Sequence, residues 1–172
     1  MPLAGTIAWS LIGLGGVTLS PTLAAWALFI LSGSIIYLGL FISRFTGENF
    51  LAKDRPKNSF DGLFMLTVLQ ALLVFSIAIP FFLQDYTSLP LTVGILTGLM
   101  WAPLSWMIQH WIGVFHATFR SAAIVIVWYL IPTQRFVAIP MAIVATYLLT
   151  IVVLEARWRR IHTGASAGGA TA

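Results

Sequence analysis

The chain has 172 residues, of which 59% are hydrophobic and only 8% are charged, and it contains no cysteine. Soluble domains have about 25% charged residues, so nine basic and five acidic side chains cannot cover a water-soluble protein of this size. The composition therefore excludes a soluble enzyme, a nucleic-acid-binding domain and a disulfide scaffold. It favours an integral membrane protein that is surrounded mostly by lipid.

Six apolar segments are long enough, or nearly so, to cross a hydrocarbon core about 30 Å thick as helices. In chain order they cover residues 3–20, 22–43, 62–83, 91–109, 114–131 and 136–154. They are apolar on every face, unlike the alternating strands of a barrel. We therefore predict an all-α, polytopic transmembrane helix bundle, with a single domain over residues 1–162 and a disordered tail over 163–172.

The stretch 91–131 needs a decision, because it is about twice as long as one crossing requires. Its ionisable groups are His110, His116 and Arg120. We divide it into two helices, with Gly113 as the expected turn residue. The alternative is one long tilted helix with a re-entrant piece.

Prolines and tryptophans give further position signals. Pro21, Pro90 and Pro132 lie between apolar segments and are interpreted as turn markers. Pro80 and Pro103 lie inside segments, where each removes a backbone donor and can kink its helix. Amphipathic tryptophan rings favour the headgroup level, so some of four residues are expected as interface anchors. These are Trp101, Trp106, Trp111 and Trp128.

The basic residues predict the orientation, because cytoplasmic loops carry an excess of lysine and arginine. If both ends of a six-helix chain are cytoplasmic, eight of the nine basic residues lie on that side. Only Arg135 then lies outside, together with the acid Asp85. The eight are Arg44, Lys53, Arg55, Lys57, Arg120, Arg157, Arg159 and Arg160.

Two ladders of small residues at four-residue spacing predict close helix packing in the membrane. They are Gly94, Gly98 and Ala102 in the fourth segment, and Ala138, Ala142, Thr146 and Thr150 in the sixth. We favour packing inside the bundle. The alternative is a face for a second copy, which makes the protein a possible homo-oligomer.

Ionisable groups at membrane depth are functional candidates by default. His116 and Arg120 are one helical turn apart and share a face. Gln109 and His110 approach the same level from the end of the fourth segment. With Gln70 from the third segment, these side chains form a candidate polar pocket that opens to the cytoplasm.

These polar residues also have purely structural interpretations. Arg120 can extend to lipid phosphates, and His110 can be an interface residue. Asp61 stands in the first turn of a helix, where an acid is favourable. Glu155 can pair with Arg159, four residues on.

The sequence gives no sign of a metal, a cofactor or a catalytic motif. His110 and His116 are six residues apart, which does not place them on one helix face. Phosphate loops, dinucleotide fingerprints and a serine elbow are absent from the sequence. No acid lies in the middle of a segment, which argues against proton-coupled transport. We expect no cofactor and no nucleic-acid partner, and an enzyme is the least favoured class.

Two short stretches resemble a family of small bacterial multi-helix membrane proteins of unknown function. They are residues 98–106 (GLMWAPLSW) and residues 49–53 (NFLAK). The resemblance implies a compact helix bundle, multi-pass in the bacterial inner membrane, and it implies no activity. That family often has a histidine where this chain has Met100, so a polar site at this position is not implied here.

Two functions fit these features. The first is a small transport or permeation protein, with Gln70, Gln109, His116 and Arg120 as its polar gate. The alternative is a structural or accessory protein that binds a partner or anionic membrane lipid through its cytoplasmic basic loop and tail. The surroundings of His116 and Arg120 distinguish them: a water-accessible cavity favours the first function, and headgroup contact favours the second.

Overall fold

The structure is a computed structural model that describes residues 2–45 and 59–168. Every regular element in these ranges is a helix, which confirms the predicted all-α class. The helices are α1 (Pro2–Thr18), α2 (Pro21–Ser43), α3 (Ser59–Gln84), the 3-10 helix η1 (Tyr86–Ser88), α4 (Leu89–Leu99), α5 (Trp101–Met107), α6 (Ile112–Leu130) and α7 (Arg135–Gly168). Because α5 continues α4 after a one-residue break, α4 and α5 count as one segment. The helices therefore form six helical segments, as predicted.

Among the residues that the structure describes, four helical stretches are long and apolar enough to cross a membrane, as expected for a membrane protein. They are Pro21–Ser43, Tyr86–Met107, Ile112–Leu130 and Arg135–Ile161. The surface agrees with this finding, because Tyr37, Leu83 and Tyr129 are each more than 75% exposed. Arg120 and Thr150, by contrast, are completely buried. This distribution reverses that of a soluble protein and fits lipid as the outer solvent.

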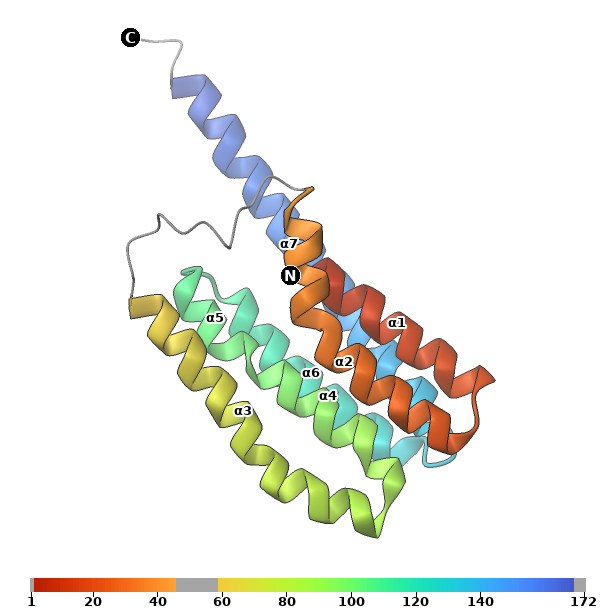
Figure 1. The fold of residues 1–172 in the computed structure, drawn as a ribbon. Helices are drawn as coiled ribbons and strands as arrows, with labels where there is room; N and C mark the ends of the chain where they lie inside the picture. Colours follow the sequence, from red (N-terminus) through yellow and green to blue (C-terminus); the bar gives the residue numbers. More distant parts are fainter. Residues whose placement is uncertain (1, 46–58, 169–172) are drawn as a thin grey trace.

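The helices alternate in direction between two ends of the bundle (Figure 1). One end holds the start of α1, the end of α2, the start of α3 and the α5–α6 turn. The opposite end holds the α1–α2 turn, η1 and the α6–α7 turn. The last part of α7 leaves the first end and continues beyond the other helices. It reaches Gly168, so the first residues of the predicted tail are helical, and residues 169–172 lie outside the described part.

Prolines begin or separate helices where the sequence predicts turns. Pro21 is the first residue of α2, Pro90 the second of α4, and Pro132 lies between α6 and α7. A proline suits the first helical turn because its missing N–H would have no intrahelical partner there. Pro80, by contrast, lies within α3, which continues on both sides of it.

Glycines let the helices approach closely. A Cβ on Gly94 would lie 3.0 Å from Ile124 Cδ1 and 3.1 Å from Ile143 Cδ1. The small-residue face of α4 therefore packs against α6 and α7, which is the packing inside the bundle that we favour. On α1, a Cβ on Gly16 would lie 2.8 Å from the carbonyl carbon of Phe136, at the start of α7.

The long stretch 91–131 is divided into two antiparallel segments, which excludes a single long helix. The predicted turn residue, however, is wrong. Gly113 lies in the first turn of α6, where a Cβ would come 2.7 Å from Ser105 Cβ. The glycine is needed for close contact between α5 and α6, and the reversal occurs at Gln109, which has φ +50°.

Candidate functional site

Arg120 lies in the core of the bundle and is 0% exposed. Its Nη1 donates to the hydroxyl of Tyr147 on α7 (3.2 Å), and its Nη2 donates to Thr97 Oγ1 on α4 (2.6 Å). The guanidinium carbon lies 5.3 Å from the ring centroid of Trp9 on α1 and 5.3 Å from that of Tyr147. Three helices thus surround the cation with hydroxyls and aromatic faces.

Arg120 stands near the middle of its helix. It is the ninth residue of α6, which has 19 residues. At about 1.5 Å per residue, it lies roughly 12 Å from the start of a helix roughly 28 Å long. The structural alternative that Arg120 extends to lipid phosphates is therefore wrong, because its guanidinium points into the protein and not to a headgroup.

His116 lies one turn before Arg120 and is also 0% exposed. Its Nδ1 is 2.8 Å from Thr150 Oγ1, and that hydroxyl donates to the carbonyl of Thr146 (2.8 Å). A hydroxyl has one proton to give, so it accepts from His116 Nδ1–H, and Nε2 is left as an acceptor. The imidazole stacks on Trp101, with ring centroids 4.3 Å apart.

These residues form one group, which we call the Arg120 cluster, and all of them are buried except the partly buried Thr97. The cluster consists of Trp9, Thr97, Trp101, His116, Arg120, Tyr147 and Thr150. Of the four tryptophans that the sequence offers as interface anchors, Trp101 is not one, because it is 6% exposed and packs against His116 and Tyr147. Trp106 and Trp111, near the α5–α6 turn, are each 60% exposed.

Polar hydrogen-bonding capacity is left unused in the Arg120 cluster. Arginine has five N–H donors, and only two nitrogens of Arg120 bond to described partners. Three buried nitrogens have no partner among the described residues: Arg120 Nε, Trp9 Nε1 and His116 Nε2. Buried polar groups are nearly always paired, so each of these atoms requires an explanation.

No described carboxylate balances the charge of Arg120. Asp85 lies 3.4 Å from Arg135 at one end of the bundle, and Glu155 lies 3.0 Å from Arg159 on the exposed part of α7. The second ion pair is the one that the sequence predicts. The side chain of Asp61 lies outside the described residues.

The fourth helical segment is broken at the level of the Arg120 cluster. Met100 separates α4 from α5, and Pro103 has no N–H to offer the carbonyl of Leu99. Next to the break, a Cβ on Gly98 would lie 3.0 Å from Arg120 Cδ and 3.1 Å from its Nε. The absence of a side chain at Gly98 therefore makes room for the arginine.

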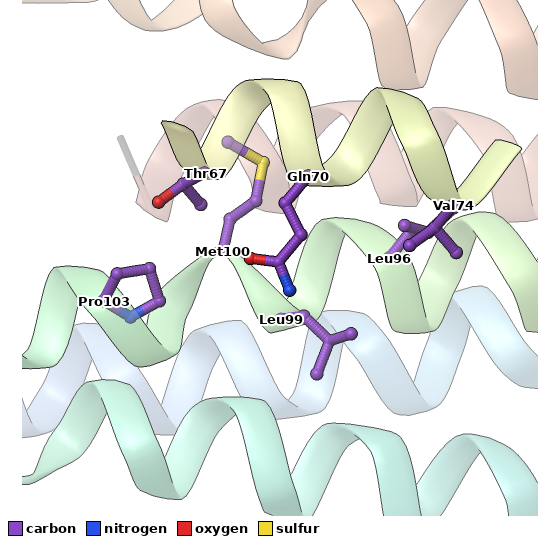
Figure 2. Close-up of a pocket in the computed structure, with 7 residues that line it drawn as sticks. All are labelled: Thr67, Gln70, Val74, Leu96, Leu99, Met100 and Pro103. Carbon is purple, nitrogen blue, oxygen red and sulfur yellow. The ribbon is translucent and has the colours of Figure 1, made fainter. Parts of the chain in front are cut away.

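Gln70 lines a separate cavity between α3 and the broken segment (Figure 2). The cavity has a volume of about 40 Å³, enough for a water molecule. Figure 2 shows the Gln70 amide extending from α3 toward Leu99 and Met100. The neighbours Thr97 and Gly98 contact Arg120, so the α4 backbone separates this cavity from the Arg120 cluster.

Gln109 and His110 lie in the α5–α6 turn, away from the Arg120 cluster. Ser105 Oγ donates to the carbonyl of His110, and the backbone N–H of Ile112 donates to His110 Nδ1 (3.2 Å). Arg157 of α7 donates to the carbonyl of Ile108 (2.9 Å). The turn is therefore held by polar side chains, although Gln109 adopts a left-handed conformation.

The five residues of the predicted pocket thus occupy three places. His116 and Arg120 are together in the core, Gln109 and His110 form a turn, and Gln70 lines its own cavity. Residue spacing in the sequence did not predict the partners of His116 and Arg120 on other helices. The sequence contained one indication of such a partner: Tyr147 is a polar residue in the same segment as the threonine hydroxyls of α7.

Within the described residues, no group of three or more histidine, cysteine or acidic side chains could hold a metal ion. Comparison with known families gives one match: the model of a family of unknown function, DUF7010, covers residues 1–157. No curated protein and no solved structure matches the chain.

Proposed function

The chain belongs to DUF7010, a family of unknown function, and we propose that it is a small transport or permeation protein of a bacterial cell membrane. In this proposal the six helical segments cross the bilayer. The Arg120 cluster recognises a solute near mid-depth. Because Arg120 and His116 are 0% exposed, this conformation is closed, and passage of a solute requires the helices to move.

The burial of Arg120 supports this proposal most directly. A charged group at membrane depth is costly, and such groups generally mark solute or ion pathways. Well-packed apolar residues often give a core equal or greater stability than buried charges do. Hence the arginine is better explained by recognition than by stability.

The broken segment supports the same proposal. Interrupted helices near the bilayer midplane commonly form binding sites in transporters, where freed backbone groups line a cavity. At Met100 the backbone keeps helical angles (φ −61°, ψ −18°), so the interruption is a local loss of helical hydrogen bonding next to Pro103. Here the break at Met100 lies between the Gln70 cavity and the Arg120 cluster. We assign the solute route to this break and to the α5–α6 turn, so that in an open conformation the Arg120 cluster connects with the turn that holds Gln109 and His110.

The charge distribution supports an orientation with both termini in the cytoplasm. Arg44 follows α2, and Arg157, Arg159 and Arg160 lie on the last part of α7, all toward one end of the bundle. At the other end, Arg135 pairs with Asp85. Under the positive-inside rule, the first end faces the cytoplasm.

Flux through reconstituted vesicles tests the transport proposal. Vesicles containing the full chain are placed in gradients of potassium chloride, potassium formate or glycerol, with valinomycin added so that potassium accompanies any anion, and light scattering reports swelling. We expect flux of at least one solute to exceed that of protein-free vesicles. Arg120→Gln, which removes the buried charge, should reduce this flux about tenfold or more, as for loss of a charged hydrogen-bonding group.

Arg160→Gln is the matched control, because it removes an equal charge from an exposed position on α7. Its flux should equal that of the wild type. Protease protection confirms that each variant is inserted. Equal flux for wild type and Arg120→Gln, or no flux of any of the three solutes, would count against a transport role.

The extension of α7 favours a second candidate function. It carries Arg157, Arg159 and Arg160 beyond the other helices, near the expected headgroup level. Clustered arginines there suit an accessory protein that binds anionic lipid. Native mass spectrometry should then show fewer bound phosphatidylglycerol molecules for Arg159→Gln/Arg160→Gln, with unchanged solute flux.

A further inference from the structure

The geometry points to a small monovalent anion as the ligand of the Arg120 cluster. This inference rests on the proposed function and names the class of solute that the site takes. The ligand carries a single negative charge and accepts hydrogen bonds from several N–H groups, as chloride or the carboxylate of formate does.

The charge of Arg120 is not balanced by the described residues around it. Arg120 brings one positive charge into the core, and arginine stays protonated in proteins. The neighbouring Thr97, Tyr147 and Trp9 offer hydroxyls and ring faces but no carboxylate. The described acids Asp85 and Glu155 are paired elsewhere. A bound anion would supply the missing charge.

Two of the buried atoms without a described partner are N–H donors. Arg120 Nε and Trp9 Nε1 each carry a hydrogen to donate, and both are buried and unpaired among the described residues. They come from α6 and α1, and the Arg120 guanidinium lies 5.3 Å from the Trp9 ring centroid. Unused donors beside a buried cation suit an acceptor with negative charge rather than a cation or an apolar solute.

The surroundings of Arg120 limit both the size and the charge of a ligand. Aromatic side chains line the site, and Trp101 and Tyr147 pack edge to face with 5.9 Å between their ring centroids. A Cβ on Gly98 would already lie 3.1 Å from Arg120 Nε, so the room beside this nitrogen is small. A second negative charge would find no second described cation in the Arg120 cluster. A small monovalent anion meets both limits.

Anion binding is measured on the purified full chain in a non-ionic detergent, apart from any flux. Sodium gluconate, whose anion is much bulkier than chloride or formate, is replaced by sodium chloride or sodium formate at constant ionic strength. We expect the melting temperature to rise and to saturate with one or both small anions. A response to both indicates general anion recognition, and a response to formate alone indicates a carboxylate site.

Two variants locate the effect. In Arg120→Gln the half-saturating concentration should increase at least tenfold, whereas Trp9→Phe, which removes one donor, should increase it several-fold. Arg135→Gln is the control, because it removes a partly buried arginine outside the Arg120 cluster, and it should keep the response. If Arg120→Gln does not fold, Trp9→Phe and the measurement below still test the inference.

Chloride-35 NMR on the wild type gives an independent result. Line broadening that formate competes away supports the inference. No broadening and no saturable change in melting temperature would overturn it, and would show that Arg120 is stabilised by its hydroxyls and ring faces alone. Anion binding without flux would defeat the transport proposal but not this inference. Glycerol flux that depends on Arg120, without anion binding, would do the reverse.

Discussion

Arg120 and His116 illustrate what residue spacing can predict and what it cannot. Their four-residue separation placed them on one helix face, and both are indeed buried together. Their partners Thr97, Tyr147 and Trp9 come from three other helices. Such contacts depend on how whole helices pack, which a single sequence with apolar residues on every helix face does not specify.

A pair of glycine variants tests the close approach of α5 and α6. Gly113→Ala places a Cβ 2.7 Å from Ser105 Cβ and 2.8 Å from its Cα. Backbone atoms cannot move as easily as the end of a side chain, so we expect a loss of about 1–3 kcal/mol of unfolding free energy. Thermal unfolding in detergent, followed by circular dichroism, measures the change.

Gly33→Ala is the matched control, because nothing lies within 4 Å of a Cβ at that position. Gly33 is inside α2, where alanine is favoured over glycine by about 1 kcal/mol. Gly33→Ala should therefore be neutral or stabilising. A similar stability loss in both variants would show that helix packing at Gly113 is not the cause.

At the scale of the elements, the sequence predicted the division of the stretch 91–131 but not the geometry of the turn. A reversal usually uses glycine where φ is positive, and this favoured Gly113. The chain instead places Gln109 there and closes the turn with bonds from Ser105 and Arg157. Side chains distant in sequence, such as Arg157, cannot be read from the local pattern.

The α5–α6 turn predicts a pH dependence of stability. Burial, and next the positive charge of Arg157, lowers the pKa of His110 below its usual value of 6.5. The unfolded chain therefore binds a proton more readily than the folded one does. The contribution of neutral His110 is present above pH 6.5 and is lost as the pH falls through the lowered pKa.

His110→Asn tests this dependence. An asparagine oxygen can accept the N–H two residues on, as His110 Nδ1 does from Ile112, but it does not titrate. The wild-type melting temperature should decrease from pH 7.5 to pH 5, and that of the variant should decrease less. Parallel curves for the two proteins would assign the acid sensitivity to other groups.

At the scale of the whole molecule, six helical segments and four helices long enough to cross a membrane agree with the composition. A helix that crosses a bilayer needs little more than sufficient length and apolar side chains. The number and approximate positions of the helices can therefore be predicted from the sequence. The separate Gln70 cavity could not be predicted from the sequence, because it depends on where α3 lies against the broken segment.

The predicted orientation is tested by fusing reporters to the C-terminus in a bacterial cell. Green fluorescent protein should be fluorescent there, and alkaline phosphatase should be inactive, because both termini are expected in the cytoplasm. Fusions in the α6–α7 turn, at Thr133, should give the opposite pattern. An active phosphatase at the C-terminus would reverse the assignment of Arg157, Arg159 and Arg160 to the cytoplasm.

The unbalanced charge of Arg120 has an electrical consequence. In the proposed transmembrane arrangement, the positive charge of Arg120 near mid-depth lies within the transmembrane voltage, which is worth about 2.3 kcal/mol per elementary charge for each 100 mV across the whole bilayer. With an anion bound, the pair is neutral and voltage acts on it weakly. Polarising the membrane would therefore bias the movement of the empty protein more than that of the loaded one.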